Sequence, residues 1–214
     1  MSTKKILCIA LTFFHFHSSI AKRPINLTIA KNKVQKYYET GAYDKDLERV
    51  VAHAKKRFKK IPVGKNATII FDIDETVLFG YPDTKSISFG YIPKLSHKWI
   101  LEADAPAIAQ VKELYDYLVQ RGFKIVFMTG RKYNEYDATI KNLKREGFTT
   151  FDKLIVRSKE EHHTPAWQYK SARRKQLVQQ GYDIVGTIGD QKSDMVGGYT
   201  GYRVKLPNYI YMID

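Results

Sequence analysis

Cysteine is nearly absent from this sequence. Its 214 residues include one, Cys8, so no disulfide can form within the chain, and stability must come from a hydrophobic core. Long apolar runs are absent as well. The apolar run at residues 6–14 is far shorter than the ~20 residues that a membrane-spanning helix needs. We therefore expect no stable membrane anchor.

The same short run has the layout of a secretory signal peptide. Lys4 and Lys5 precede it, and small residues follow it at positions 19 and 21. This order of basic, apolar and small residues predicts cleavage after Ala21 and a secreted or periplasmic mature protein. Cys8 would be removed with residues 1–21, and residues 22–214 are long enough for a single well-packed domain.

Acidic residues are the minority charge. The chain has 22 Asp and Glu against 36 Lys and Arg, a formal net charge of +14, and this excess attracts anions such as phosphate esters. The densest basic run, residues 55–60, follows a predicted helix, where the helix dipole favours cations. We interpret it as a solvated helix end, with nucleic-acid or membrane binding as the alternative. No nucleic-acid polymer is expected as a partner, and no pattern predicts an oligomeric state.

Helical and strand patterns alternate along the chain. In a helical lead-in over residues 22–66, Asp44 is the predicted N-cap of a helix that reaches Phe58. The apolar run at residues 67–73 predicts a buried strand. Predicted helices at residues 107–121, 133–146 and 168–180 then alternate with predicted strands at residues 124–128, 153–156, 183–188 and 202–206. This order predicts an α/β fold with a Rossmann-like open parallel sheet flanked by helices.

One segment interrupts the alternation. Residues 77–104 make a connection after the first strand that is too long for an ordinary loop, and we expect a small cap insertion there. Its aromatic side chains could form the core of the cap or stack on a nucleobase or aryl leaving group. They are Phe79, Tyr81, Phe89, Tyr91 and Trp99.

Polar and charged residues collect where the predicted strands end. Ligands of open α/β sheets bind beyond the carboxyl ends of the strands, and carboxylates beside an apolar run need compensation, which a hard cation can supply. A hydroxyl, a lysine and four acids at one sheet edge suit phosphoryl transfer. In chain order the residues are Asp72 and Asp74, then Thr129, Gly130 and Arg131, then Lys170, placed before the third helix, and finally Asp190 and Asp194.

These segments resemble, in the same order, the four motifs of the haloacid dehalogenase-like superfamily. The similarity is greatest to the secreted acid phosphatases related to the class B and class C enzymes and to plant vegetative storage proteins. The resemblance implies a Mg²⁺-dependent acid phosphatase that hydrolyses phosphomonoesters, nucleoside monophosphates among them, through an aspartyl-phosphate. The alternatives are phosphate transfer to alcohols or nucleosides, and a non-catalytic storage or binding protein. The motifs are residues 72–76, 128–131, 169–171 and 189–194.

The resemblance implies a role for each of these residues. Asp72 would be the nucleophile and Asp74 the general acid and base. Mg²⁺ would be held by Asp72, Asp190 and the backbone carbonyl of Asp74, with Asp194 acting close to the metal or simply as a turn or N-cap acid. Arg131 would contact the substrate or pair with a nearby acid. The residues that would bind the phosphoryl group of a small phosphomonoester are Thr129, Gly130, Arg131 and Lys170.

Overall fold

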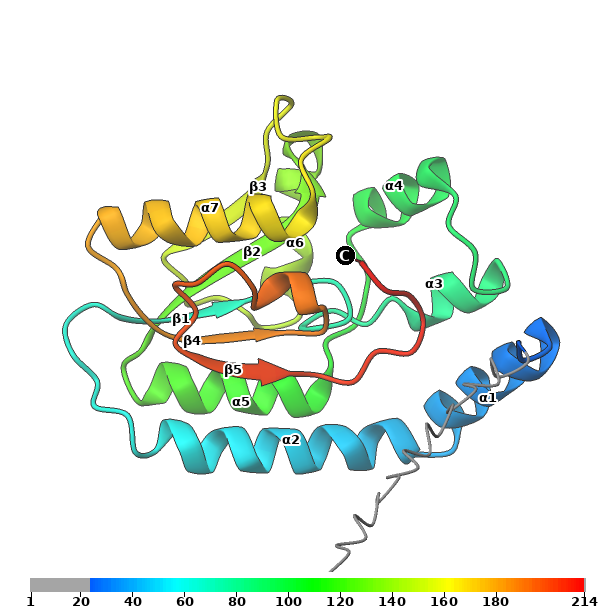
Figure 1. Ribbon diagram of the computed structural model, residues 1–214, viewed down its shortest axis with the longest axis horizontal. Helices are drawn as coiled ribbons and strands as arrows, with labels where there is room; N and C mark the ends of the chain where they lie inside the picture. The colour runs from blue at the N-terminus through cyan, green and yellow to red at the C-terminus, as the bar shows by residue number, and fades with distance from the viewer. Residues whose placement is uncertain (1–23, 214) are drawn as a thin grey trace, which may run out of the picture.

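A five-stranded parallel sheet runs through the protein, which a computed structural model describes for residues 24–213 (Figure 1). The predicted signal peptide and Cys8 lie outside the described residues. Within residues 24–213, no helix is both long enough and apolar enough to cross a membrane. The strands are β1 (Ala67–Phe71), β2 (Lys124–Lys132), β3 (Lys153–Arg157), β4 (Asp183–Gly189) and β5 (Tyr202–Lys205).

The central strand is β1, which pairs in parallel with β2 on one side and β4 on the other. The sheet order is β3-β2-β1-β4-β5, so the chain winds outward from β1 in one direction and then crosses to wind in the other. Every residue of β1 is buried, which explains its unbroken apolar run. Such a reversal of winding opens a crevice at the carboxyl ends of the two inner strands. The predicted α/β fold is confirmed.

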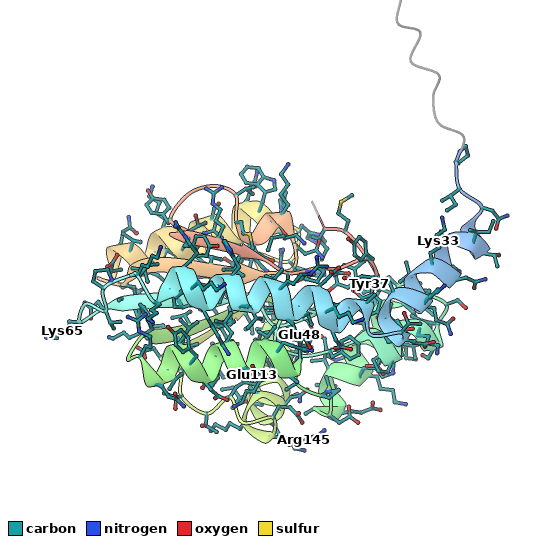
Figure 2. All side chains as sticks on the ribbon, turned by 90° about the horizontal axis from the view of Figure 1, so that it is seen from below. Lys33, Tyr37, Glu48, Lys65, Glu113 and Arg145 are labelled. Atoms are coloured by element: carbon teal, nitrogen blue, oxygen red, sulfur yellow. The ribbon has the colours of Figure 1, made fainter. Side chains whose placement is uncertain are left out.

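Helices cover both faces of the sheet. On one face, α5 (Ala109–Gln120) and α6 (Tyr136–Arg145) contribute to the larger hydrophobic core, and α2 (Ala42–Phe58) packs beside α5. Figure 2 shows these two helices side by side, with Glu48 on α2 and Glu113 on α5. On the other face, α7 (Ala166–Gln179) packs against β1, β2 and β4 through a smaller apolar cluster that includes Leu177.

The helical lead-in consists of two helices. The first, α1 (Leu27–Glu39), projects from the body, and Figure 2 shows Lys33 on its outer part and Tyr37 where it meets α2. The predicted N-cap at Asp44 is wrong, because Gly41 takes that position with a φ of 76° and Asp44 lies in the first turn. Glycine adopts this left-handed conformation without strain. Tyr43 is buried, so the buried face of α2 begins before the aliphatic pattern at Leu47.

Several boundaries also differ from the predicted ones. The strand expected at residues 124–128 continues to Lys132, so β2 includes the polar residues that were placed after it. A short 3-10 helix, η1 (Tyr133–Glu135), precedes α6. The third helix was predicted at residues 168–180, with the motif residue Lys170 placed before it. That placement is wrong, because the helix begins at Ala166 as α7 and includes Lys170.

The insertion after β1 contains two short helices, α3 (Tyr81–Ser86) and α4 (Pro93–Glu102). Figure 1 shows α4 close to the C-terminal end of the chain. The aromatic residues of the insertion divide into two groups. Tyr81 is 6% exposed and stacks on Tyr38 of α1 with ring centroids 4.7 Å apart, and Phe79 packs against it. Tyr91, in contrast, is 75% exposed.

Candidate active site

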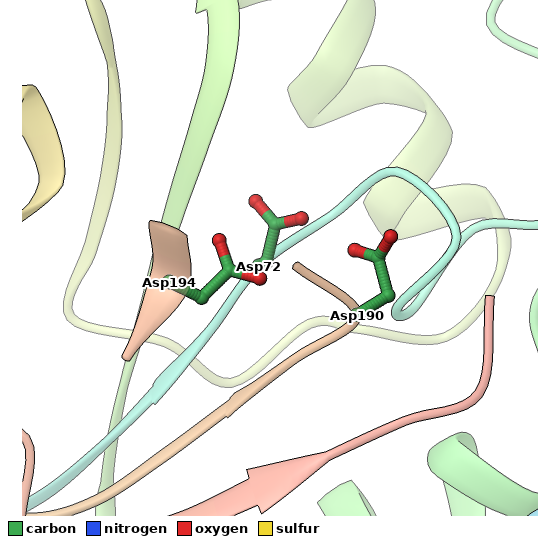
Figure 3. A group of neighbouring side chains, drawn as sticks. All are labelled: Asp72, Asp190 and Asp194. Carbon is green, nitrogen blue, oxygen red and sulfur yellow. The ribbon is translucent and has the colours of Figure 1, made fainter. Parts of the chain in front are cut away.

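Three buried carboxylates meet where β1 and β4 end. Asp72 follows β1, and its backbone N–H donates to the carbonyl of Ile188 in β4 at 2.9 Å. Asp190 directly follows β4, and Asp194 ends the 3-10 helix η2 (Lys192–Asp194). One carboxylate oxygen from each of the three acids lies within 4.8 Å of the others, and Figure 3 shows how they converge.

This group of acids fits a hard divalent cation. Buried carboxylates are unfavourable without a compensating cation, and carboxylate oxygens are the ligands that Mg²⁺ and Ca²⁺ prefer. Burial raises the pKa of Asp72 and of Asp190, and neighbouring acids add to the effect. Asp74 is not part of the group, so its predicted metal contact depends on its backbone carbonyl and stays a prediction.

Lys170 supplies positive charge to the same group. Its Nζ donates to Asp72 Oδ1 at 2.6 Å and to Asp194 Oδ1, and the side chain is buried. Burial opposes the charge, but the two carboxylates outweigh it and raise the pKa of Lys170. Lys170 is therefore positively charged at any physiological pH, as a phosphoryl-binding cation must be.

The other two acids are also held by neutral donors. Asp194 Oδ2 accepts the N–H of Gln191 at 2.8 Å, so Asp194 is both a turn acid and a partner of Lys170, while its predicted role close to a metal stays a prediction. Asp190 accepts the hydroxyl of Thr76 at 3.1 Å and the amide of Asn208 at 2.6 Å. Neither Thr76 nor Asn208 was predicted to contact the site, because their partner lies 114 and 18 residues away in the chain.

A buried arginine braces the loop that carries Asp194. Arg174 is 0% exposed and lies one turn after Lys170 on α7. Its guanidinium donates to the backbone carbonyls of Asp194 at 2.6 Å and Gly198 at 2.9 Å, and also to that of Val196. Burial lowers the pKa of Arg174 to about 10, and within residues 24–213 it has no carboxylate partner. No motif in the sequence points to Arg174, because backbone acceptors leave no residue pattern.

Asp74 lies in a different environment from Asp72. Its side chain is 40% exposed, while Asp72 is 6% exposed. The guanidinium of Arg131 donates to Asp74 Oδ1 at 2.8 Å, and the hydroxyl of Thr129 donates to Oδ2 at 3.2 Å. Burial opposes ionisation, but the charge and hydrogen bonds of Arg131 outweigh it and lower the pKa of Asp74. Of the two predicted roles of Arg131, pairing with an acid is the one the geometry displays.

A cavity of about 560 Å³ opens in front of Asp72 and Asp74. Gly130 and Lys170 border it from the body of the protein. Its far walls come from α3 and α4 with the segment between them, and from the C-terminal tail at residues 210–213, and most of their residues are apolar. The tail is fixed by Gln191, whose side-chain oxygen accepts the N–H of Ile213 at 2.9 Å. The aromatic residues that border the cavity are Phe89, Tyr91, Trp99 and Tyr211.

The sequence of this chain is similar to a protein family and to individual proteins of known name. The family model described as HAD superfamily, subfamily IIIB (Acid phosphatase) matches residues 2–214. The Stem 28 kDa glycoprotein of Glycine max is 37% identical over 185 residues, which cover 84% of this chain and 73% of that protein. Acid phosphatase 1 of Solanum lycopersicum is 35% identical over 186 residues, with the same two coverages.

A storage protein and a solved structure are also similar. Vegetative storage protein 1 of Arabidopsis thaliana is 33% identical over 156 residues, 70% of this chain and 57% of that protein. The class C acid phosphatase from Bacillus anthracis superposes with a TM-score of 0.71 over 87% of this chain and 85% of that chain. At 23% identity, this last likeness concerns the fold.

Proposed function

Because the chain belongs to the acid phosphatases of subfamily IIIB of the HAD superfamily, we propose that it is a Mg²⁺-dependent phosphomonoesterase that forms an aspartyl-phosphate. Small phosphomonoesters, nucleoside monophosphates among them, would be its substrates. The observation that carries the proposal is the contact of Asp72 with Lys170 at 2.6 Å inside the group of three acids.

In the first step, Asp72 attacks phosphorus and the bond to the leaving oxygen breaks. Lys170 engages Oδ1 of Asp72, while Oδ2 accepts no hydrogen bond from the described residues and is free to attack. Lys170 and the backbone of Gly130 border the cavity at the place where the phosphoryl oxygens would lie, whereas the hydroxyl of Thr129 is buried and donates to Asp74. Donors fixed in advance stabilise the charge that develops on those oxygens.

Proton transfer is the task of Asp74. Its carboxyl faces the cavity, so it can protonate the leaving alcohol and then accept a proton from the water that opens the aspartyl-phosphate. Arg131 contacts both of its oxygens, at 3.1 and 3.2 Å from Nε, and so fixes its orientation. Burial raises the pKa of Asp72 and the contact with Arg131 lowers that of Asp74, the reverse of the order that an ionised nucleophile and a protonated general acid require. The proposed roles therefore depend on a bound cation that lowers the pKa of Asp72.

Asp72, Asp190 and Asp194 are the residues that would hold Mg²⁺. When bound there, the ion would neutralise negative charge on the phosphoryl oxygens. It would also lower the pKa of Asp72, whose burial acts in the opposite direction.

Export of the mature protein is part of the proposal. The signal-peptide pattern of residues 1–21 supports it, and so do relatives that are named stem glycoproteins. Asp72 also weighs against a storage protein without activity, because the carboxylate nucleophile is present with its lysine partner. Transfer of the phosphoryl group to an added nucleoside, in place of water, is the remaining alternative.

The test is a panel of phosphomonoesters assayed with Mg²⁺ and with a chelator. We expect hydrolysis that requires the ion, and a loss of at least about 10⁴-fold in kcat for Asp72→Asn, since the nucleophile is removed. Asp183→Asn, an exposed acid at the amino end of β4 and so at the opposite edge of the sheet, is the matched control. Product analysis with added nucleoside separates hydrolysis from transfer. Full activity of Asp72→Asn would refute the mechanism.

A further inference from the structure

Arg157, at the carboxyl end of β3, is buried without an acidic partner. It is 9% exposed, and no carboxylate of the described residues lies in ion-pair distance of it. Arg131, its neighbour at the end of β2, is also buried but pairs with Asp74. The two strand ends therefore carry two buried cations, one neutralised and one free.

The guanidinium of Arg157 is fixed in one orientation. Its Nη1 donates to the carbonyls of Glu161 at 2.9 Å and Thr164 at 2.5 Å, and its plane lies over the ring of Tyr169 at 4.7 Å. Arginine has five N–H donors, so those on Nε and Nη2 remain, and neither atom has an acceptor within the described chain. This edge is the one that receives a carboxylate or phosphate through two parallel hydrogen bonds.

The free edge opens on the catalytic cavity. Arg157 borders the same cavity as Asp72 and Asp74, and its Nε lies 3.9 Å from the point that a Cβ on Gly130 would occupy. Arg157 pairs with Lys132 across β3 and β2. Because β3 and β4 lie on opposite sides of β1, Arg157 lies on the side of the phosphoryl site away from Asp190.

The acids nearest to this edge are already engaged. Glu161 accepts the guanidinium of Arg173 at 2.6 Å and the N–H of Ser158 at 2.9 Å. Glu135 accepts the N–H of Lys132 at 2.7 Å and contacts His97 at 2.7 Å. Burial lowers the pKa of Arg157, as expected for a cation removed from water without a counter-ion. A protein group is thus not positioned to neutralise Arg157, but a substrate in the cavity is.

We propose that Arg157 binds a second oxyanion, carried by the leaving group of the substrate. The preferred substrates would then be phosphomonoesters of acidic alcohols, in which a carboxylate or another phosphate lies a few bonds from the reacting phosphorus. This inference rests on the proposed phosphatase function and specifies its substrate class. The bound anion would complete a desolvated pair that the free protein lacks.

The test compares esters that differ by one anionic group. O-phosphoserine and O-phosphoethanolamine differ by a carboxylate, and adenosine 3′,5′-bisphosphate and AMP differ by a phosphate. For at least one pair we expect kcat/KM of the wild type to favour the more acidic ester by about 10- to 100-fold, the usual worth of a charge-assisted pair. The pair that shows the preference identifies the oxyanion.

Variants of Arg157 separate binding from support of the fold. Arg157→Gln should bring the ratio of kcat/KM within each pair close to one, mainly through KM, and Arg157→Lys should restore part of it. Lys159→Gln is the matched control, because Lys159 is an exposed cation two residues further along the chain that does not border the cavity. It should leave the ratios unchanged.

Other results would overturn the inference. If Arg157 only supports the fold, Arg157→Gln would lower activity on both members of each pair and leave the ratio of their kcat/KM values at that of the wild type. Wild-type ratios near one in both pairs, with active hydrolysis, would reject the second oxyanion but not the phosphatase. If no ester were hydrolysed, the proposed function would fail, and calorimetric binding of phosphoserine and phosphoethanolamine, with and without Arg157→Gln, would still decide the inference.

Discussion

The two walls of the catalytic cavity are built in opposite ways. At the ends of β1 and β4, charged side chains are buried, and Lys170, Asp72 and Asp194 contact one another. On the far side, α4 buries none of its residues, and Met212 of the tail is 81% exposed. The first wall is fixed by the sheet and by paired charges, whereas the second contributes little to the core. We infer that chemistry belongs to the first wall. The second wall can vary at little cost to the fold, so we assign to it the choice of the apolar part of the leaving group, beside the preference for an oxyanion that we assign to Arg157.

Removing the central cation should produce the largest change among the remaining variants. Lys170→Met takes away one fixed donor to the transition state, so we expect kcat to fall by about 10²- to 10³-fold. It also leaves buried acids uncompensated, which should cost about 3–5 kcal/mol of unfolding free energy in chelator. Assays with an aryl phosphate and urea unfolding measure the two effects. Lys175→Met, on the exposed face of the same helix, is the control, and equal kcat in both variants would contradict the assignment.

Arg174 tests whether the first wall depends on buried support. In Arg174→Met, the carbonyls of Asp194, Val196 and Gly198 lose their donor, and unsatisfied buried groups cost about 1–3 kcal/mol each. We expect the free energy of unfolding, measured with heat or urea, to fall by at least about 3 kcal/mol. We also expect half-maximal activity to need a higher Mg²⁺ concentration, because Asp194 is no longer held in place. The fall in kcat should be smaller than in Lys170→Met. Wild-type stability in this variant would show that the guanidinium is dispensable.

The pairing of Arg131 with Asp74 predicts a pH effect. In the proposed mechanism Asp74 must be protonated to release the leaving alcohol, so activity should be present below its pKa and be lost as pH rises through it. Arg131 holds the pKa of Asp74 low, which confines this activity to acidic pH. Arg131→Gln should therefore move the falling limb of the kcat profile to higher pH, while kcat at its maximum falls because Asp74 is less well oriented. If the falling limb of the kcat profile did not move in Arg131→Gln, a group other than Asp74 would be responsible for that limb.

The sequence predicted the first wall better than the second. The ends of parallel strands converge at one sheet edge, so Asp72 and Asp190, which follow predicted strands, could be brought together from the strand pattern, whereas Lys170 reaches Asp72 from inside α7. Membership of the family confirms the resemblance that those motifs carry. Arg174 and Arg157 act through backbone carbonyls or free donors, which leave no pattern in the sequence. The tail was also missed, because its contact with Gln191 joins segments that only the fold brings together.

The smallest expected effect comes from the second wall and distinguishes its two groups of aromatic residues. Tyr91 is exposed at the cavity, so Tyr91→Ala should change stability by less than about 0.5 kcal/mol. It should lower kcat/KM by about threefold to tenfold for aryl or nucleoside phosphates and leave a small alkyl phosphate unaffected, since stacking contributes only modestly.

Tyr81 provides the contrast, because its buried ring stacks on Tyr38 and its hydroxyl donates to Glu39 at 2.9 Å. Tyr81→Ala should cost about 3–5 kcal/mol of stability and reduce activity on all esters alike, since the ring supports the base of the insertion and does not border the cavity. If Tyr81→Ala changed the selectivity between esters without loss of stability, the structural role assigned to Tyr81 would be wrong. Urea unfolding and a two-substrate comparison on both variants decide between these outcomes.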